Sequence, residues 1–164
     1  MRKLLGAVAL AGMLAMPGTV QAQAQPQTVV GGLVGYHDDA EALGVGAYAS
    51  FAVPQLHENI SIMPSFVYYF PDGIDAWELN GDVAYRFSVS SDSPVIPVAF
   101  AGLNIFHTSV SAGGFSASNT DIGLNLGGAV VFPLESIRPS AGAKFELQNA
   151  TSFVIFGALG FPIG

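Results

Sequence analysis

Residues 76–87, which read AWELNGDVAYRF, show a strict two-residue alternation. One face carries Trp77, Leu79, Gly81, Val83, Tyr85 and Phe87, and the other carries Ala76, Glu78, Asn80, Asp82, Ala84 and Arg86. Successive side chains of a β-strand point to opposite sides of the sheet, so this pattern predicts a strand with one apolar and one polar face. The pattern recurs in residues 43–53, 120–132 and 139–148.

Eight strand-like stretches are predicted along the chain. They cover residues 28–36, 43–53, 59–70, 75–87, 95–108, 120–132, 139–148 and 152–163. Most have the length that a tilted membrane-spanning strand needs. Residues 109–119, rich in serine and glycine, are predicted to be the longest loop. Pro64 lies inside the third stretch and predicts a β-bulge there, because it cannot donate a ladder hydrogen bond.

The composition is unusual for a soluble domain. Hydrophobic residues make up 51% of the chain and charged residues only 10%, whereas about 25% is typical for the charged group. Beyond the N-terminal segment no run of 18 apolar residues could form a membrane helix. A closed barrel, in which the strands satisfy all backbone polar groups, is the other structure that can span lipid.

Three features predict that the apolar faces point into lipid. Glycines lie on the polar faces, where they would leave room in a narrow lumen. The apolar faces carry more bulk than such a lumen could hold. Trp77 and Phe87 are separated by about 33 Å along a strand, or about 25 Å when tilted, which matches the spacing of two aromatic girdles. The girdle residues are expected to be Trp77, Tyr85, Phe87 and Phe132. A soluble sandwich or lipocalin-like barrel is the alternative.

The first 22 residues are typical of a secretory signal peptide. Arg2 and Lys3 precede an apolar run that is too short to span a membrane. Small residues favour cleavage after Ala22 or Ala24, which would leave a barrel domain at residues 23–164 exported through the Sec pathway. An uncleaved anchor helix is the alternative.

The charge of the mature chain argues against nucleic acid as a partner. Arg86, Arg138 and Lys144 remain against twelve acidic residues, a net charge of −9, and no basic patch is present. The absence of cysteine excludes disulfides and thiol chemistry. His37 and His57 are assigned to loops without partners at metal-ligand spacing, so neither a metal site nor a cofactor is expected.

Residues 119–128 (NTDIGLNLGG), followed by a proline-containing turn and residues 138–147 (RPSAGAKFEL), resemble the last hairpins of the small outer-membrane barrels of the OmpA, OmpX and opacity type. The resemblance implies an all-β, eight-stranded, antiparallel, porin-like up-and-down barrel in the bacterial outer membrane. It also implies contact with outer-membrane lipid and lipopolysaccharide and insertion by the outer-membrane assembly machinery. The sequence does not name an extracellular ligand. The ending Phe161-Pro162-Ile163-Gly164 departs from the terminal aromatic residue of such barrels.

An even number of strands places both chain ends in the periplasm. The connections after the first, third, fifth and seventh strands then face outward, and the others face the periplasm. The outward set includes the acidic segment 37–41 and the turn at residues 71–73.

Polar residues on the inward faces are interpreted as a structural network that fills the lumen. Its predicted members are Glu78, Asp82, Arg86, Asp121, Asn125, Lys144 and Glu146. A buried ammonium needs a counter-charge, so Lys144 is predicted to contact Asp82, Asp121 or Glu146. A narrow solute pore is the alternative interpretation.

His107-Thr108-Ser109 together with Asp121 loosely resembles the His-x-Ser and acid arrangement of outer-membrane lipid A deacylases. A histidine oriented by an acid can activate a serine. The alternation, however, places His107 on the lipid-facing side of its strand and Asp121 on the lumen side. The sequence therefore favours a non-enzymatic barrel with a structural or surface-interaction role and no catalytic residues, with a lipid A-modifying esterase as the alternative.

Overall fold

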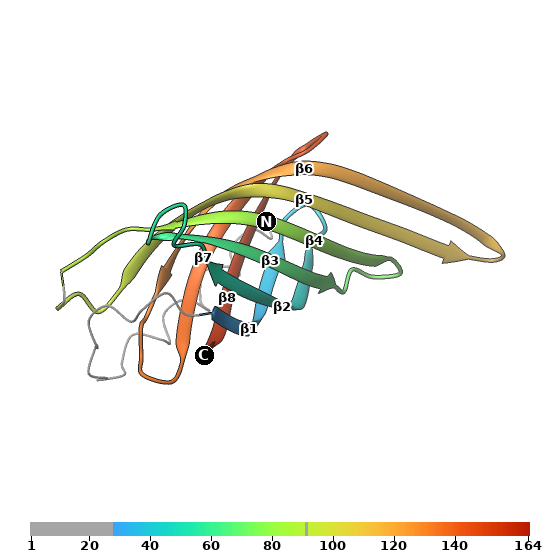
Figure 1. The fold of residues 1–164 in the computed structure, drawn as a ribbon. Helices are drawn as coiled ribbons and strands as arrows, with labels where there is room; N and C mark the ends of the chain where they lie inside the picture. Colours follow the sequence, from blue (N-terminus) through green and yellow to red (C-terminus); the bar gives the residue numbers. More distant parts are fainter. Residues whose placement is uncertain (1–27, 91) are drawn as a thin grey trace, which may run out of the picture.

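The computed structural model describes residues 28–90 and 92–164, and the proposed signal peptide lies outside them. Within this part the chain forms eight antiparallel strands that close into an up-and-down barrel, each strand pairing with its sequence neighbours and β8 pairing with β1 (Figure 1). The strands are β1 (Thr28–His37), β2 (Ala42–Ala52), β3 (Ile60–Tyr69), β4 (Asp75–Arg86), β5 (Ile96–Ala112), β6 (Phe115–Val131), β7 (Arg138–Leu147) and β8 (Thr151–Ile163). No helix in the described residues is long and apolar enough to cross a membrane.

The predicted strand boundaries agree with the structure to within one residue, except where β5 ends and β6 begins. The prediction of a loop at residues 109–119 is wrong. The two strands continue through it and turn at Gly113 and Gly114, which have φ angles of 59° and 83°. Glycine adopts such left-handed angles without steric cost. The small polar residues that resemble a loop in the sequence are paired instead, for example Ser109 with Ser118.

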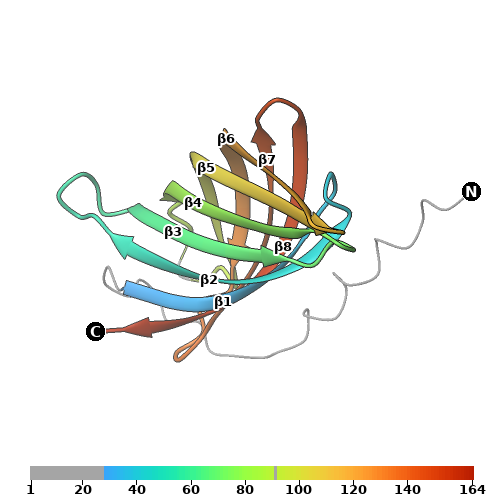
Figure 2. The ribbon, with the colours of Figure 1, turned by 90° about the vertical axis from the view of Figure 1, so that its right-hand side faces the viewer.

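The extra length makes β5 and β6 project beyond the rest of the barrel (Figure 1), and Figure 2 views the barrel from the side toward which they project. Pairing of β4 with β5 stops at Asp75 and Ser109, and pairing of β6 with β7 stops at Leu124 and Leu147. The remainder is a two-stranded ribbon, residues 110–123, here called the β5–β6 ribbon. The start of β1 and the end of β8 lie at one end of the barrel, which we call the terminal end. The β5–β6 ribbon lies at the opposite end.

Pro64 does not produce the predicted bulge. The β2–β3 register is the same on both sides of it, with Tyr48 opposite Ser65 and Phe51 opposite Ile62. Ladder pairs are absent between these positions, whereas the pairing of Pro64 with Gly81 on β4 is kept. The ring therefore interrupts the ladder on one side without inserting an extra residue.

The barrel has a polar interior and an apolar exterior. Leu79 is 46% exposed and Leu126 56%, whereas the adjacent Glu78 and Asn125 are 0% and 2% exposed. A soluble barrel would have the reverse arrangement, so that alternative is excluded by the structure. Small closed barrels with an apolar outer belt are built to stand in lipid.

Candidate functional site in the barrel lumen

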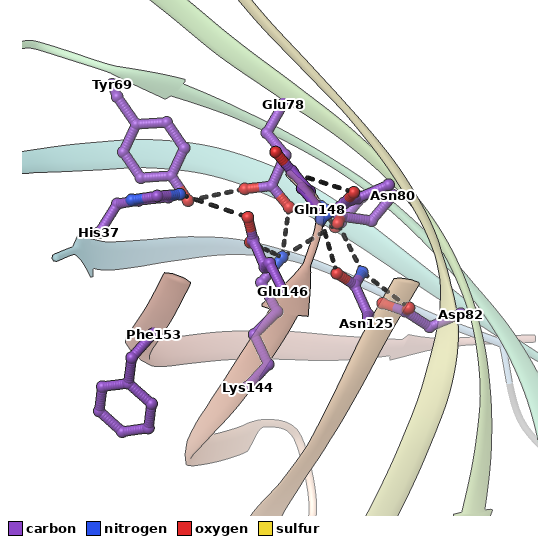
Figure 3. A network of polar contacts seen from close by, with 12 residues as sticks. His37, Tyr69, Glu78, Asn80, Asp82, Asn125, Lys144, Glu146, Gln148 and Phe153 are labelled. Carbon is purple, nitrogen blue, oxygen red and sulfur yellow. Dashed lines mark hydrogen bonds and ion pairs between the residues drawn. The ribbon is translucent and has the colours of Figure 1, made fainter. Parts of the chain in front are cut away.

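The charged centre of the lumen joins two strands that are not neighbours, β4 and β7 (Figure 3). Lys144 on β7 donates hydrogen bonds to Glu78 Oε1 and, over 3.0 Å, to Asn80 Oδ1 on β4. Its Nζ also lies 2.8 Å from Oε1 of Glu146, as an ion pair outside hydrogen-bonding geometry. Lys144 is buried and both glutamates are fully buried. Each charge therefore has a compensating partner out of water, which a buried charge requires.

His37 covers this centre on the side away from the terminal end. The backbone N–H of Ala40 donates to Nδ1 over 3.2 Å, so we place the ring proton on Nε2. Nε2 faces Oε2 of Glu146 at 3.3 Å. The assignment of His37 to a partnerless loop was wrong, because β1 extends one residue further than predicted and carries the ring, 2% exposed, into the lumen.

Tyr69 completes the cover. Its hydroxyl donates to Oε2 of Glu78 over 2.8 Å, and its ring meets the His37 ring edge-on with centroids 5.3 Å apart. Phe106 stacks on His37 with centroids 5.0 Å apart and also lies 6.0 Å from the Tyr69 ring. Gly44 makes room for this packing, since a Cβ there would lie 2.5 Å from Cδ1 of Tyr69.

An amide chain extends the network across β4, β5 and β6. Asn125 donates to Asn80 Oδ1 over 2.7 Å and to Asp82 Oδ1 over 2.9 Å. Asn104 donates to Asn125 Oδ1 over 2.9 Å, and Gln148 donates to Asn104 Oδ1 over 3.1 Å. Amide groups carry both donors and acceptors, so they can pass a hydrogen-bond chain from one wall to the next.

These groups together form a feature that we call the polar plug. Its members are His37, Tyr69, Glu78, Asn80, Asp82, Asn104, Asn125, Lys144 and Glu146, all of them buried. Large side chains joined by direct contacts occupy the lumen at this level. An eight-stranded barrel is narrow enough for side chains to fill its interior, and these nine side chains occupy it at this level.

Below the plug, toward the terminal end, the lumen opens into a cavity of about 190 Å³, here called the luminal chamber. Its wall is mostly apolar or small, and includes Val29, Met63, Val98, Phe100, Val131, Phe156 and Ala158. Asn80, Asp82 and Lys144 form its polar boundary on the plug side, and Arg86 and Arg138 also line it. A barrel lumen is ordinarily polar, so this apolar chamber is a distinct feature.

Arg86 lies outside the network to which the sequence assigned it. It is the last residue of β4, beyond the level of the plug, and it lines the chamber instead. Arg138 is the first residue of β7 and lines the chamber together with Arg86. Its Nη1 donates to the carbonyl oxygen of Leu134 over 2.6 Å.

Asp121 is also outside the polar plug. It shares the inward parity of β6 but lies beyond the point where pairing with β7 ends, so no opposite strand brings Lys144 toward it. Its carboxylate accepts hydrogen bonds from Asn119 over 2.6 Å and from Asn149 over 2.8 Å. It therefore joins the base of the ribbon to the β7–β8 turn.

The residues that could form a deacylase-like site are not assembled. His107 Nδ1 lies 2.8 Å from Oγ1 of Thr120, and the His107 ring stacks on Trp77 on the outer face with centroids 5.1 Å apart. Asp121 is on the inward face of β6. A catalytic triad requires the acid to orient the histidine beside the serine, and this arrangement does not do so.

Aromatic side chains lie on the outer wall toward both ends of the barrel. Tyr85 and Phe87 pack edge-to-face, 39% and 47% exposed, near the terminal end. Trp77 packs against Phe66 near the other end. Phe132 directly follows β6 at the terminal end and is half-buried. Aromatic residues at these positions are typical of the two membrane–water boundaries of such barrels, and the assignment of these four to girdles stays a prediction.

The geometry thus defines a class: a small antiparallel barrel with a lipid-facing exterior and a plugged lumen. Among solved structures, the chain is similar to the N-terminal β-barrel domain of Pseudomonas aeruginosa OprF, with a TM-score of 0.70 and 14% identity, covering 86% of this chain and 100% of that one. It is also similar to Neisserial surface protein A, with a TM-score of 0.65 and 15% identity, covering 83% of this chain and 96% of that one. Its similarity to Ail, the attachment invasion locus protein of Yersinia pestis, has a TM-score of 0.61 and 13% identity, covering 84% of this chain and 97% of that one. No protein-family model and no curated protein sequence matches it. The fold is that of the small outer-membrane barrels.

Proposed function

We propose that this protein is a bacterial outer-membrane barrel that acts through its outer surface, as a structural or surface-interaction protein, rather than as an open pore or an enzyme. The observation that carries the proposal is the combination of a plugged lumen and a projecting β5–β6 ribbon. The fold shared with outer-membrane barrels and the signal-like N-terminal segment support the location. Outer-membrane lipid, lipopolysaccharide and the assembly machinery are the partners that this location implies.

The β5–β6 ribbon has the properties of a contact surface. Phe115 at its tip is 79% exposed and Val110 is 41% exposed. Residues 115–123 of β6 have no pairing with β7 among the described residues, so they present a free strand edge. Free edges pair readily with extended segments of other chains. The names of two neighbours in fold, a surface protein and an attachment invasion locus protein, agree with such a role.

The topology is tested by cysteine labelling, for which the absence of native cysteine provides a clean background. Ser116→Cys in the ribbon and Ser90→Cys in the β4–β5 connection lie at opposite ends and are both exposed. In intact cells a membrane-impermeant maleimide is expected to label Ser116→Cys and to label Ser90→Cys only after permeabilisation. Labelling of Ser90→Cys alone, or recovery of the protein as a soluble periplasmic monomer, would contradict the proposal.

The closed lumen is tested by conductance. Purified barrel inserted into planar bilayers is expected to give no channel steps above background, because the polar plug fills the lumen with buried, mutually bonded side chains. A porin inserted by the same protocol serves as the positive control. Stable, ion-selective steps from the wild-type chain would favour the narrow-pore alternative.

A further inference from the structure

The luminal chamber combines two properties that the polar plug does not use. Its wall is mostly apolar, with serines among its smaller residues, although the interior of a membrane barrel is ordinarily polar. Two arginines also line it, and among the described residues neither has a carboxylate within ion-pair distance. The guanidinium of Arg86 moreover has no hydrogen-bond partner in that part of the chain, and only Nη1 of the Arg138 guanidinium is engaged, by a carbonyl. Two guanidinium groups with free donors beside an apolar cavity require an explanation.

The chamber is reached from the terminal end. The inward-facing residues of that end, such as Ala52, Val131 and Ala158, are partly exposed, whereas Val67 and Tyr69 beside the plug are buried. A ligand that enters from the terminal end therefore meets the arginines and the open part of the lumen, and its inner end stops at the plug.

We propose that the luminal chamber binds a single-chain fatty acid of medium length, with its carboxylate on Arg86 and Arg138 and its hydrocarbon chain in the apolar cavity. Guanidinium groups bind carboxylates through paired, charge-assisted hydrogen bonds. The chain buries apolar surface against the wall. The site does not depend on the surface role proposed above.

The volume sets the chain length. An apolar cavity of about 150 Å³ holds a benzene molecule, which has six carbons. The chamber, at about 190 Å³, therefore accommodates a chain of about eight carbons. Two-chain lipids exceed this volume. Octanoate is accordingly the probe, with 1-octanol as the matched molecule without charge and acetate as the one without a chain.

Met63 provides a reporter inside the site. It lines the chamber and is the only methionine after residue 16. The folded barrel, with its methionine methyl groups labelled with carbon-13, is placed in nanodiscs of phosphatidylcholine and titrated with each probe. Octanoate is expected to shift the Met63 methyl signal in a saturable way, 1-octanol to bind about tenfold or more weakly, and acetate to have no effect.

Two variants test separately how the guanidinium charge and the apolar cavity contribute to octanoate binding. Arg86→Gln is expected to weaken octanoate binding about tenfold through loss of a charge-assisted hydrogen bond, while 1-octanol binding stays unchanged. Ala158→Phe fills the chamber and is expected to abolish binding of both. Heat-modifiable gel mobility confirms that each variant is folded. The proposal is overturned by the absence of a saturable shift with the wild-type barrel, by equal affinity for octanoate and 1-octanol, or by wild-type octanoate affinity in folded Arg86→Gln.

Discussion

Leu126→Arg is expected to destabilise the inserted barrel by about 2–4 kcal/mol, because it places a charge on the lipid face near the middle of the membrane. Leu126 is 56% exposed on the outer wall of β6 and pairs with Ala101 of β5 and Phe145 of β7. Loss of heat-modifiable folded protein and a lower urea midpoint in lipid vesicles would measure the effect.

Ser118→Arg is the matched control, since it adds the same charge on the same strand but in the exposed β5–β6 ribbon. It is expected to change stability by less than about 0.5 kcal/mol. If Leu126→Arg had no effect while Ser118→Arg was severe, the lipid-facing belt would have been placed on the wrong part of β6.

Lys144→Met is expected to lower stability by about 3–5 kcal/mol, the usual cost of removing one partner of a buried ion pair. Methionine keeps most of the side-chain volume, so the loss reports charge rather than packing. Glu78 and Glu146 would remain fully buried without the ammonium that lies between them. Denaturant titration of the refolded barrel in neutral detergent gives the free energy of unfolding.

The triple variant Lys144→Met/Glu78→Gln/Glu146→Gln distinguishes stranded charge from a damaged core. It removes all three charges while keeping the side chains nearly isosteric. We expect it to recover most of the stability lost in Lys144→Met, since replacing a whole buried ionic group is often close to neutral. A triple variant as unstable as Lys144→Met would show that the ionic contacts are not the source of the loss.

The strand pattern of the chain could be predicted from local sequence because alternation is a local property. The parity of residues 76–87 assigns Leu79 outward and Glu78 inward, as the structure shows. Asn104 and Phe100, at even positions of β5, are likewise inward. The ribbon could not be predicted, because its serines and glycines are equally common in loops and only pairing between β5 and β6 makes them strands.

The members of the polar plug could be predicted only in part. Alternation named Glu78, Asp82, Asn125, Lys144 and Glu146 as inward residues, and the structure brings them together. His37 and Tyr69 were missed, because β1 was ended one residue early and β3 carries no charge that would attract attention to Tyr69. Both residues share the parity of the inward-facing positions of their strands, and this is the signal that could have found them. Gly44 on the neighbouring strand leaves room for the Tyr69 ring.

The sequence by itself determined the strands and which residues share a face, because hydrophobic alternation is a local property. It favoured an outward apolar face, and the structure excluded the soluble alternative. Only the tertiary structure decided which inward residues meet. Strand tilt and register set the height of each side chain in the lumen, so Lys144 reaches Glu78 across two intervening strands, while Arg86 and Asp121, equally inward, lie at other levels. The same heights leave an apolar chamber between the plug and the two arginines.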